Sequence, residues 1–419
     1  MSSKAPIAPT DVLIPRGVDL SRWCVLASDQ YSSVRDYWQS VEEYVGGQPS
    51  TLQMIVPEVY LTVESADELA TRVSRTRVAM DQALESVFQR YDNSVIYVER
   101  ATERVKRRRS LLVGIDLEDY SFTPHEPADI RASEETVLER IPAREAVRAQ
   151  ASVELPHVQV LFDDPLNRVF SFIDVAQETH DEQLQPVYDT PLMMGGGVVR
   201  GWRISGDSVL WRNLNNALND LDTHGRGFRF VVGDGNHSLA AARSHWLKLK
   251  KAGAREDHPA RFALVELIEV HDSGLTMEPI HRWVRGVSEE DLRDAFDRWN
   301  ASHPQAKLQS VSLVCGDTVS EISVAQPQAL VIESVQNVID ELIAVRNLDP
   351  SYACEYIHGD EELKRLVAEQ GGVGIFLPSI DRSALFDYVA NRGVMPRKSF
   401  SLGEAEEKRY YLEGRRIIE

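Results

Sequence analysis

The stretch Phe228–Lys250, FRFVVGDGNHSLAAARSHWLKLK, decides the fold expected for this chain. Residues 228–232 form a short run of aromatic and β-branched side chains, which predicts a strand. Residues 233–235 place glycines on both sides of a carboxylate, and such a sequence permits a tight turn with positive φ. Residues 239–250 then place apolar side chains on one face of a helix, with Asn236 as its expected N-cap.

The turn between this strand and this helix brings several polar groups to one point. Backbone N–H groups at a helix N-terminus, together with the helix dipole, favour an anion there. We therefore predict an anion site at the turn, with Asp234 and His237 as catalytic residues. The remaining residues of the turn are expected to bind the anion, such as a phosphate group: Gly233, Gly235, Asn236 and Ser238. The same residues could also do no more than connect a strand to a helix, since short motifs often occur by chance.

Composition excludes several classes of protein. The chain has 419 residues and a formal net charge of −19, which repels a polyanion, so we expect no nucleic-acid partner. Three scattered cysteines without a CxxC pair argue against a disulfide framework and fit a reducing cytoplasm. No apolar run approaches the roughly 20 residues needed to cross a membrane, so we expect no membrane partner and a cytoplasmic location. The sequence leaves the oligomeric state open.

Polar clusters elsewhere in the chain give candidates of second rank. Asp163 and Asp164 follow an expected strand at 157–162, where they could hold a divalent cation or form an Asp-Pro turn. A lone histidine is more often a hydrogen-bonded structural residue than a ligand. The second-rank site residues are Asp29, Gln30, Glu278, His281, Arg282 and His358.

The loop at 395–401, MPRKSFS, supplies two cations and two hydroxyls after a proline. Charge and donors of this kind suit a phosphate or carboxylate group. We therefore predict that Arg397, Lys398 and Ser399 bind phosphate or nucleotide. An exposed basic turn is the alternative interpretation.

Several stretches resemble the bacterial domain-of-unknown-function family numbered ten-fifteen. They are GDGNHSLAAA, HPARFALVELIEVHD, MEPIHRWV, SDQYSS, RASEETVLERIP, YDTPLMMGGG, EYIHGDEE and MPRKSFSLGEAEEKRYYLE. The turn GDGNH is also similar to the DGHHR-type turn of the ParB-like superfamily, which includes nucleotide-binding segregation proteins, sulfiredoxin and a free serine kinase. That resemblance implies a nucleotide or phosphate site at the turn. Ser238 stands where an arginine is often found, and Arg397 and Lys398 could compensate for it.

The alternation of strands and helices predicts an α/β or mixed α+β fold with a mixed sheet. The resemblance favours a ParB-like core at 121–290 that carries the turn. An N-terminal segment at 1–120 and a C-terminal α/β segment at 291–419 flank this core. The loop at 395–401 is expected to fold back and complete the site.

The turn and the resemblance together imply phosphoryl transfer or phosphate-ester hydrolysis on a small hydroxy compound, with serine or phosphoserine as the leading candidate. Mg²⁺, held by Asp234, and a nucleotide are the expected cofactors. Two alternatives remain open. The first is a non-catalytic nucleotide-binding or sensing protein. The second is a metal-dependent hydrolase that uses Asp234, His237, Glu278 and His281.

Overall fold

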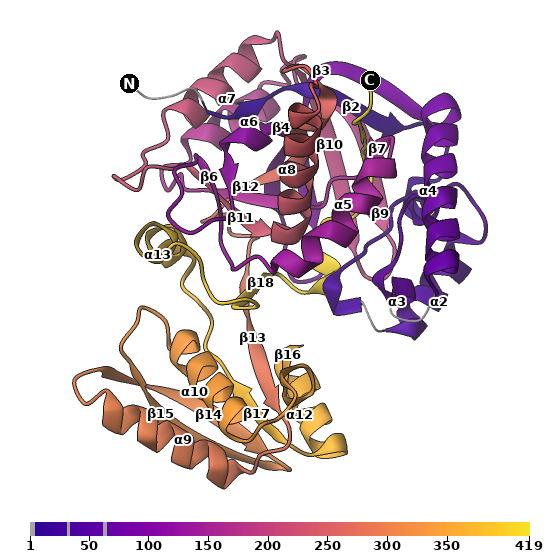
Figure 1. Ribbon diagram of the computed structural model, residues 1–419. Coiled ribbons are helices and arrows are strands. Elements are labelled where there is room, and N and C mark those ends of the chain that lie inside the picture. The colour runs from indigo at the N-terminus through magenta and orange to yellow at the C-terminus, as the bar shows by residue number, and fades with distance from the viewer. Residues whose placement is uncertain (1–4, 32–33, 62–64) are drawn as a thin grey trace. The chain divides into compact units, whose positions relative to one another are not determined.

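The computed structural model describes residues 5–31, 34–61 and 65–419, and it confirms a mixed α/β fold. The chain forms two compact units, labelled in Figure 1 by their helices and strands. Unit 1 contains the chain up to Thr276 together with Ala405–Glu419, and unit 2 contains Met277–Glu404. The chain therefore leaves unit 1, forms unit 2 and then returns.

Eleven strands of the described chain form one sheet in unit 1, in the order β5-β6-β11-β8-β12-β4-β3-β10-β9, with β1 beside β4 and β2 beside β3. The pairs β5–β6, β6–β11 and β8–β12 are parallel, whereas β11 and β8 are antiparallel. The predicted mixed sheet is thus confirmed. The strands of unit 1 are β1 (Ile7–Ala8), β2 (Thr10–Pro15), β3 (Phe88–Ala101), β4 (Arg108–Asp116), β5 (Tyr120–Ser121), β6 (Ile130–Ala132), β7 (Val153–Glu154), β8 (Gln159–Phe162), β9 (Gln185–Leu192), β10 (Gly197–Ser205), β11 (Phe230–Asp234), β12 (Phe262–Glu269) and β19 (Arg415–Arg416).

Helices pack on this sheet, and Figure 1 shows α8 in front of its strands. A hydrogen bond of 2.7 Å from Ser244 Oγ to Glu145 Oε2 joins α8 to α5. The helices of unit 1 are α1 (Leu20–Trp23), α2 (Arg35–Val45), α3 (Glu58–Leu61), α4 (Ala66–Ser86), α5 (Ile141–Gln150), α6 (Arg168–Glu178), α7 (Val209–Asn219) and α8 (Asn236–Lys251). In the part of the chain that the structure describes, no helix combines the length and the apolar character needed to span a membrane.

The C-terminal segment 405–419 is an integral part of unit 1. Trp23 Nε1 donates to the carbonyl oxygen of Leu412 at 2.9 Å, and Leu412 is buried in the same hydrophobic cluster as Trp23. The backbone N–H of Tyr411 donates to the carbonyl oxygen of Val25 at 2.9 Å. The two ends of the chain therefore share one core.

Unit 2 is built on an antiparallel sheet in the order β15-β14-β17-β13-β16, with β18 also paired to β13. Helices α9 and α10 contribute to its own hydrophobic cluster. Its elements are β13 (Met277–Val284), α9 (Glu289–Ser302), β14 (Lys307–Cys315), β15 (Thr318–Gln326), α10 (Val331–Val345), α11 (Pro350–Ala353), β16 (Cys354–His358), α12 (Asp360–Gln370), β17 (Val373–Phe376), α13 (Leu385–Arg392) and β18 (Phe400–Leu402). The division of the chain into segments at 1–120, 121–290 and 291–419, and the ParB-like character of the middle one, stay predictions.

Two adjacent arginines of β19 test how strongly the C-terminal segment holds unit 1 together. Arg415 Nε lies 2.6 Å from Glu154 Oε1, and both side chains are buried, whereas Arg416 is exposed. Arg415→Met should lower the free energy of unfolding by about 3 kcal/mol, because removing one partner leaves a buried carboxylate short of a cation. Arg416→Met should change it by less than about 0.5 kcal/mol. Urea unfolding followed by circular dichroism measures both.

The pH dependence of this difference has a defined sign. Burial raises the pKa of Glu154, but the charges of Arg415 and Arg148 outweigh burial and lower the pKa below its ordinary value of 4.5. A carboxyl whose pKa is lower in the folded state stabilises the fold above pH 4.5 and loses this contribution as the pH falls through the folded value. The cost of Arg415→Met should therefore shrink in acid. Equal costs for both variants at pH 7 would contradict the stabilising role of the segment.

Candidate functional site

The predicted turn lies where β11 ends and α8 begins. Asp234 is the last residue of β11, and Gly235 is the N-cap of α8, with a φ of +84°. A Cβ at Gly235 would lie 2.9 Å from Val158 Cγ2, so both the backbone conformation and the space require glycine. The prediction that Asn236 is the N-cap is wrong, because the left-handed Gly235 starts the helix one residue earlier. The strand and the helix themselves are confirmed, but β11 spans Phe230–Asp234, so Gly233 and Asp234, which the sequence predicts in the turn, end the strand.

The loop after β6 lies beside this turn, because β6 and β11 are parallel neighbours and their carboxyl ends meet. Asn236 Nδ2 donates to Ser133 Oγ at 3.3 Å, and the backbone N–H of Val137 donates to His237 Nε2 at 3.1 Å. His237 Nε2 therefore carries a lone pair and not a proton. Two hydrogen bonds thus join the start of α8 to residues 133–137.

Asp234 carries the charge of the site. Its Oδ1 accepts from the backbone N–H of Gly235 at 2.8 Å, and its Oδ2 lies 2.7 Å from Nζ of Lys408. Burial raises the pKa of Asp234, but the charge and hydrogen bond of Lys408 outweigh burial and lower the pKa below its ordinary value. The side chain is 38% exposed. The turn therefore presents an ionised carboxylate that solvent can still reach.

A second histidine, which the sequence analysis did not identify, completes the surroundings of the turn. His157 Nε2 lies 2.9 Å from Ser238 Oγ, and the His157 ring meets the ring of Tyr411 edge-on, with centroids 5.6 Å apart. Burial lowers the pKa of His157, and the nearby charge of Asp234 opposes this effect only in part. Lys408 and Tyr411 come from the C-terminal segment. No spacing in the sequence connects that segment with the turn.

Unit 2 holds most of the other predicted site residues. His281 Nδ1 accepts from the backbone N–H of Leu377 at 3.1 Å, and its Nε2 lies 2.8 Å from Asp360 Oδ1, so its ring is fixed on both sides. Burial lowers the pKa of His281, against the opposing effect of Asp360. Glu278 lies in β13 opposite Ser401 of β18.

Two predicted cations of unit 2 meet at one tyrosine. The guanidinium carbon of Arg282 lies 4.5 Å from the ring centroid of Tyr356, and Arg397 Nε donates to Tyr356 Oη at 2.9 Å. Arg282 is fully buried and also donates to Gln336 Oε1 at 2.8 Å. The structure thus brings Arg282 and Arg397 together.

The remaining predicted residues are distributed over both units. Ser399 Oγ donates to the carbonyl oxygen of Pro396 at 2.7 Å, and Lys398 has a φ of +55°. His358 ends β16. In unit 1, Asp29 and Gln30 lie in a single 3-10 turn, Asp29–Tyr31. That the loop at 395–401 shares a cleft with Asp234 stays a prediction.

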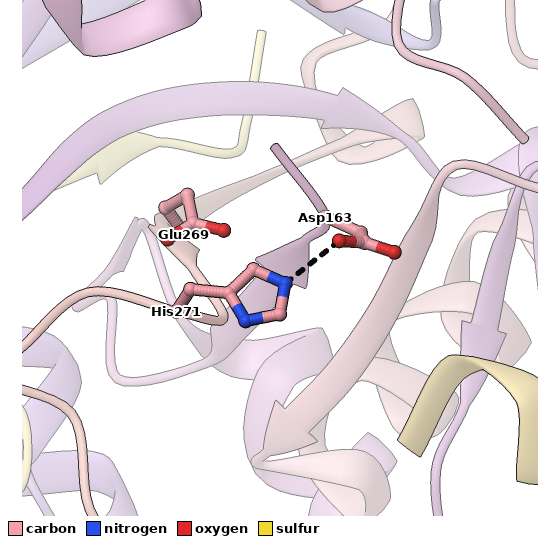
Figure 2. Close-up of side chains that lie close together, drawn as sticks. All are labelled: Asp163, Glu269 and His271. Atoms are coloured by element: carbon pink, nitrogen blue, oxygen red, sulfur yellow. Dashed lines mark hydrogen bonds and ion pairs between the residues drawn. The ribbon is translucent and has the colours of Figure 1, made fainter. Parts of the chain in front are cut away.

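One group of potential metal ligands exists among the described residues, and it does not contain Asp234. Asp163, Glu269 and His271 place ligand atoms within 4.8 Å of one another (Figure 2). These three residues follow or end the parallel strands β8 and β12. Because β8 and β11 are antiparallel, the carboxyl ends of β8 and β12 lie at the opposite end of the strands from the turn. His271 Nε2 lies 2.9 Å from Asp163 Oδ1, and Arg226 Nη1 lies 2.8 Å from Asp163 Oδ2. Asp163 is therefore already paired on both oxygens.

These features define an α/β protein with a carboxylate and an ammonium at the N-terminus of a helix. The family model described as "Protein of unknown function (DUF1015)" matches residues 12–351, so the chain belongs to that family. No curated protein matches the chain significantly.

Solved structures with some similarity have low identity and low TM-scores. A conserved hypothetical protein from Pyrococcus furiosus is 11% identical, with a TM-score of 0.35, over 73% of this chain and 95% of that one. A free serine kinase in complex with AMP is 11% identical, with a TM-score of 0.38, over 73% of this chain and 91% of that one. SbnI with a C-terminal truncation, from Staphylococcus aureus, is 11% identical, with a TM-score of 0.36, over 73% of this chain and 87% of that one. Such low scores carry no argument about function.

The surroundings of His157 predict its titration. Because burial lowers its pKa below 6.5, His157 should be neutral at pH 7. As the pH falls below 6.5, the unfolded chain takes up this proton more readily than the folded one, so stability should decrease. An NMR titration of the imidazole, assigned with His157→Gln, should give a midpoint below 6.5. The exposed His224→Gln is the control and should leave the NMR signal of His157 and its midpoint unchanged. A His157 midpoint above 6.5 would contradict the burial argument.

Proposed function

We propose that the turn 233–238 is the centre of a phosphoryl-transfer or phosphate-ester hydrolysis site that acts on a small hydroxy compound. Serine or phosphoserine is the leading candidate. The observation that carries the proposal is the ionised Asp234 carboxylate, 38% exposed, at the N-terminus of α8. Phosphoryl transfer needs mainly positioning and charge neutralisation. A helix N-terminus with a neighbouring ammonium supplies both.

In the transfer direction, the hydroxyl oxygen of the substrate forms a bond to phosphorus while the bond from phosphorus to the leaving oxygen breaks. The electron pair of the broken bond stays on the leaving oxygen. Asp234 accepts the proton of the attacking hydroxyl, since a positioned carboxylate can act as a general base. In hydrolysis a water molecule takes the place of the hydroxyl. His237 handles a proton only at Nδ1, because its Nε2 accepts from the backbone of Val137.

The residues also fit Mg²⁺. This ion is usually bound by one or two carboxylates together with substrate phosphates. Lys408 lies on Oδ2 of Asp234, whereas Oδ1 has a single backbone donor, so Oδ1 is the oxygen that would hold the ion. Bound there, Mg²⁺ would neutralise phosphate charge.

A nucleotide-binding protein without turnover is the second candidate. The close pairing of Asp234 with Lys408 favours it, because a carboxylate held by an ammonium is a weaker base. The metal-dependent hydrolase has less support. The one group of potential metal ligands in the described residues contains none of Asp234, His237, Glu278 and His281.

Asp234→Asn tests the central residue. Purified protein is incubated with Mg²⁺ and phosphoserine, and separately with serine and ATP or ADP, and the products are followed by ³¹P NMR. We expect wild-type turnover to fall about 10²- to 10⁴-fold in Asp234→Asn, because the general base is lost. Asp220→Asn changes an exposed aspartate at the end of α7 and should keep full activity. No wild-type turnover, with nucleotide binding still measurable by calorimetry, would leave the binding protein as the function.

His237→Gln separates proton transfer from positioning. Glutamine retains an acceptor for the backbone N–H of Val137 but cannot titrate. We expect His237→Gln to fold normally and to lose about 10²-fold in kcat, the usual contribution of a general acid or base. If His237→Gln is fully active and His237→Ala is not, His237 positions the loop and carries no proton.

A further inference from the structure

Lys408 is a buried cation whose hydrogen-bonding capacity is only partly used. Its side chain is 9% exposed, and its Nζ lies 2.7 Å from Asp234 Oδ2. A lysine ammonium has three donors. Among the described residues, Asp234 is the one side chain to which Nζ donates. Two N–H groups therefore remain for another acceptor on a side chain that is largely buried.

The backbone around Lys408 is fixed, so its side chain is the part that can respond to a ligand. Arg100 Nη2 donates to the carbonyl oxygen of Glu406 at 2.7 Å, and Arg108 Nη1 donates to that of Glu407 at 2.9 Å. On the other side, the backbone N–H of Tyr411 bonds to Val25. The base of the side chain is thus anchored, while the four-carbon stem of a lysine stays flexible.

Other buried polar atoms at the same turn have no hydrogen-bond partner among the described residues. They are Asn236 Oδ1 and Thr136 Oγ1, on residues that are each 8% exposed. Asn236 begins α8, and Thr136 precedes Val137, whose N–H bonds to His237. In addition, α8 has no side-chain N-cap. Buried polar groups are usually paired, so these two atoms point to a polar ligand. Thr136 Oγ1 can donate to an oxygen of an anion, whereas Asn236 Oδ1 can only accept, as it would from a hydroxyl group.

We propose that Lys408 is the residue that binds the phosphoryl group at this site, and that its ammonium leaves Asp234 for the phosphate oxygens when the ligand binds. This inference rests on the proposed function for the nature of the ligand. Because Lys408 Nζ bonds to Asp234, the residue before the N-cap of α8, an anion at the start of this helix could contact both the ammonium and the N–H groups of the helix. The phosphoryl group belongs either to a nucleotide or to a small phosphate ester.

The exchange also has a consequence for Asp234. When Lys408 moves to the phosphate, Asp234 loses the charge that lowers its pKa, and the phosphate adds negative charge nearby. Asp234 then becomes a better proton acceptor at the moment when the hydroxyl is present. While it is paired with Lys408, Asp234 is therefore a weak base, and it becomes a stronger one only when the phosphate binds.

Two variants with opposite expected effects on phosphate affinity, Lys408→Met and Asp234→Asn, test this exchange. Calorimetry is carried out without Mg²⁺, so that loss of a metal ligand does not affect the result, with inorganic phosphate, ADP and phosphoserine as separate probes. Lys408→Met should weaken binding of the phosphate-bearing probes about 10- to 100-fold, the usual effect of losing a hydrogen bond to a charged group. Asp234→Asn should bind them at least as tightly as wild type, because it releases Lys408 and removes a repelling charge. A purely structural ion pair predicts losses in both variants.

Lys248→Met is the matched control. Lys248 also pairs with a carboxylate, Glu145, at 2.6 Å, but its side chain is 71% exposed. Its removal should leave phosphate affinity within about twofold of wild type, as for most exposed pairs. If Lys408→Met fails to fold, the double variant Asp234→Asn, Lys408→Met leaves no unpaired charge and should show the same loss of affinity.

The outcomes separate this inference from the proposed function. If wild type binds the probes and Lys408→Met binds them with the same affinity, the role of Lys408 is overturned, but the proposed phosphoryl-transfer site is not. Weaker binding in Asp234→Asn would overturn the exchange, since Asp234 would then help to hold the ligand. If wild type binds none of the three probes, the proposed function itself fails. Tighter binding of ADP than of phosphoserine identifies the nucleotide as the source of the phosphoryl group.

Discussion

The return of the C-terminal segment into unit 1 is the constraint on which the site depends. Glu266 of β12 is 1% exposed, and a carboxylate so deeply buried is costly without cationic partners. Burial raises its pKa, but the charges of Arg108 and Arg409 outweigh burial and lower the pKa to about 2. Arg409 also pairs with Glu413, itself fully buried. The segment 405–419 therefore supplies a cation that the buried carboxylate in the middle of the sheet requires. The same segment also carries Lys408.

Local chemistry in the sequence predicts the turn, the flanking strand and helix, and the mixed α/β class. These depend on residues close together in the chain, such as Gly235, whose positive φ and short distance to Val158 leave room for no other residue. Even here the helix start is displaced by one residue. A left-handed glycine can serve as the N-cap without a side-chain hydrogen bond, so Asn236 is not needed for it.

Lys408 could not be predicted in the same way. It is 174 residues from Asp234, and Glu406, Glu407 and Arg409 around it form a charged stretch of the kind that is usually exposed to solvent. Its burial follows from the ion pair of Arg409 with Glu266 and from the hydrogen bonds that Arg100 and Arg108 make to the backbone of its neighbours, and these contacts are long-range. His157 was missed for a related reason. A single histidine before an apolar strand gives no sign of a site in the sequence. The fold places His157 Nε2 2.9 Å from Ser238 Oγ, and this contact is what brings it to the turn.

The charges of the turn also explain why a lysine suits this position better than an arginine. Without a ligand, Asp234 and Lys408 neutralise each other, so the buried ammonium is not left unpaired. Under the proposed function, a phosphoryl group would bring a second anion next to Asp234, and the one ammonium would then be shared or transferred. A compact charge on a flexible stem can move between two acceptors, whereas the planar fork of arginine favours one fixed bidentate geometry. A site that must stay neutral when empty and still bind an anion when loaded therefore favours a single mobile cation beside its carboxylate.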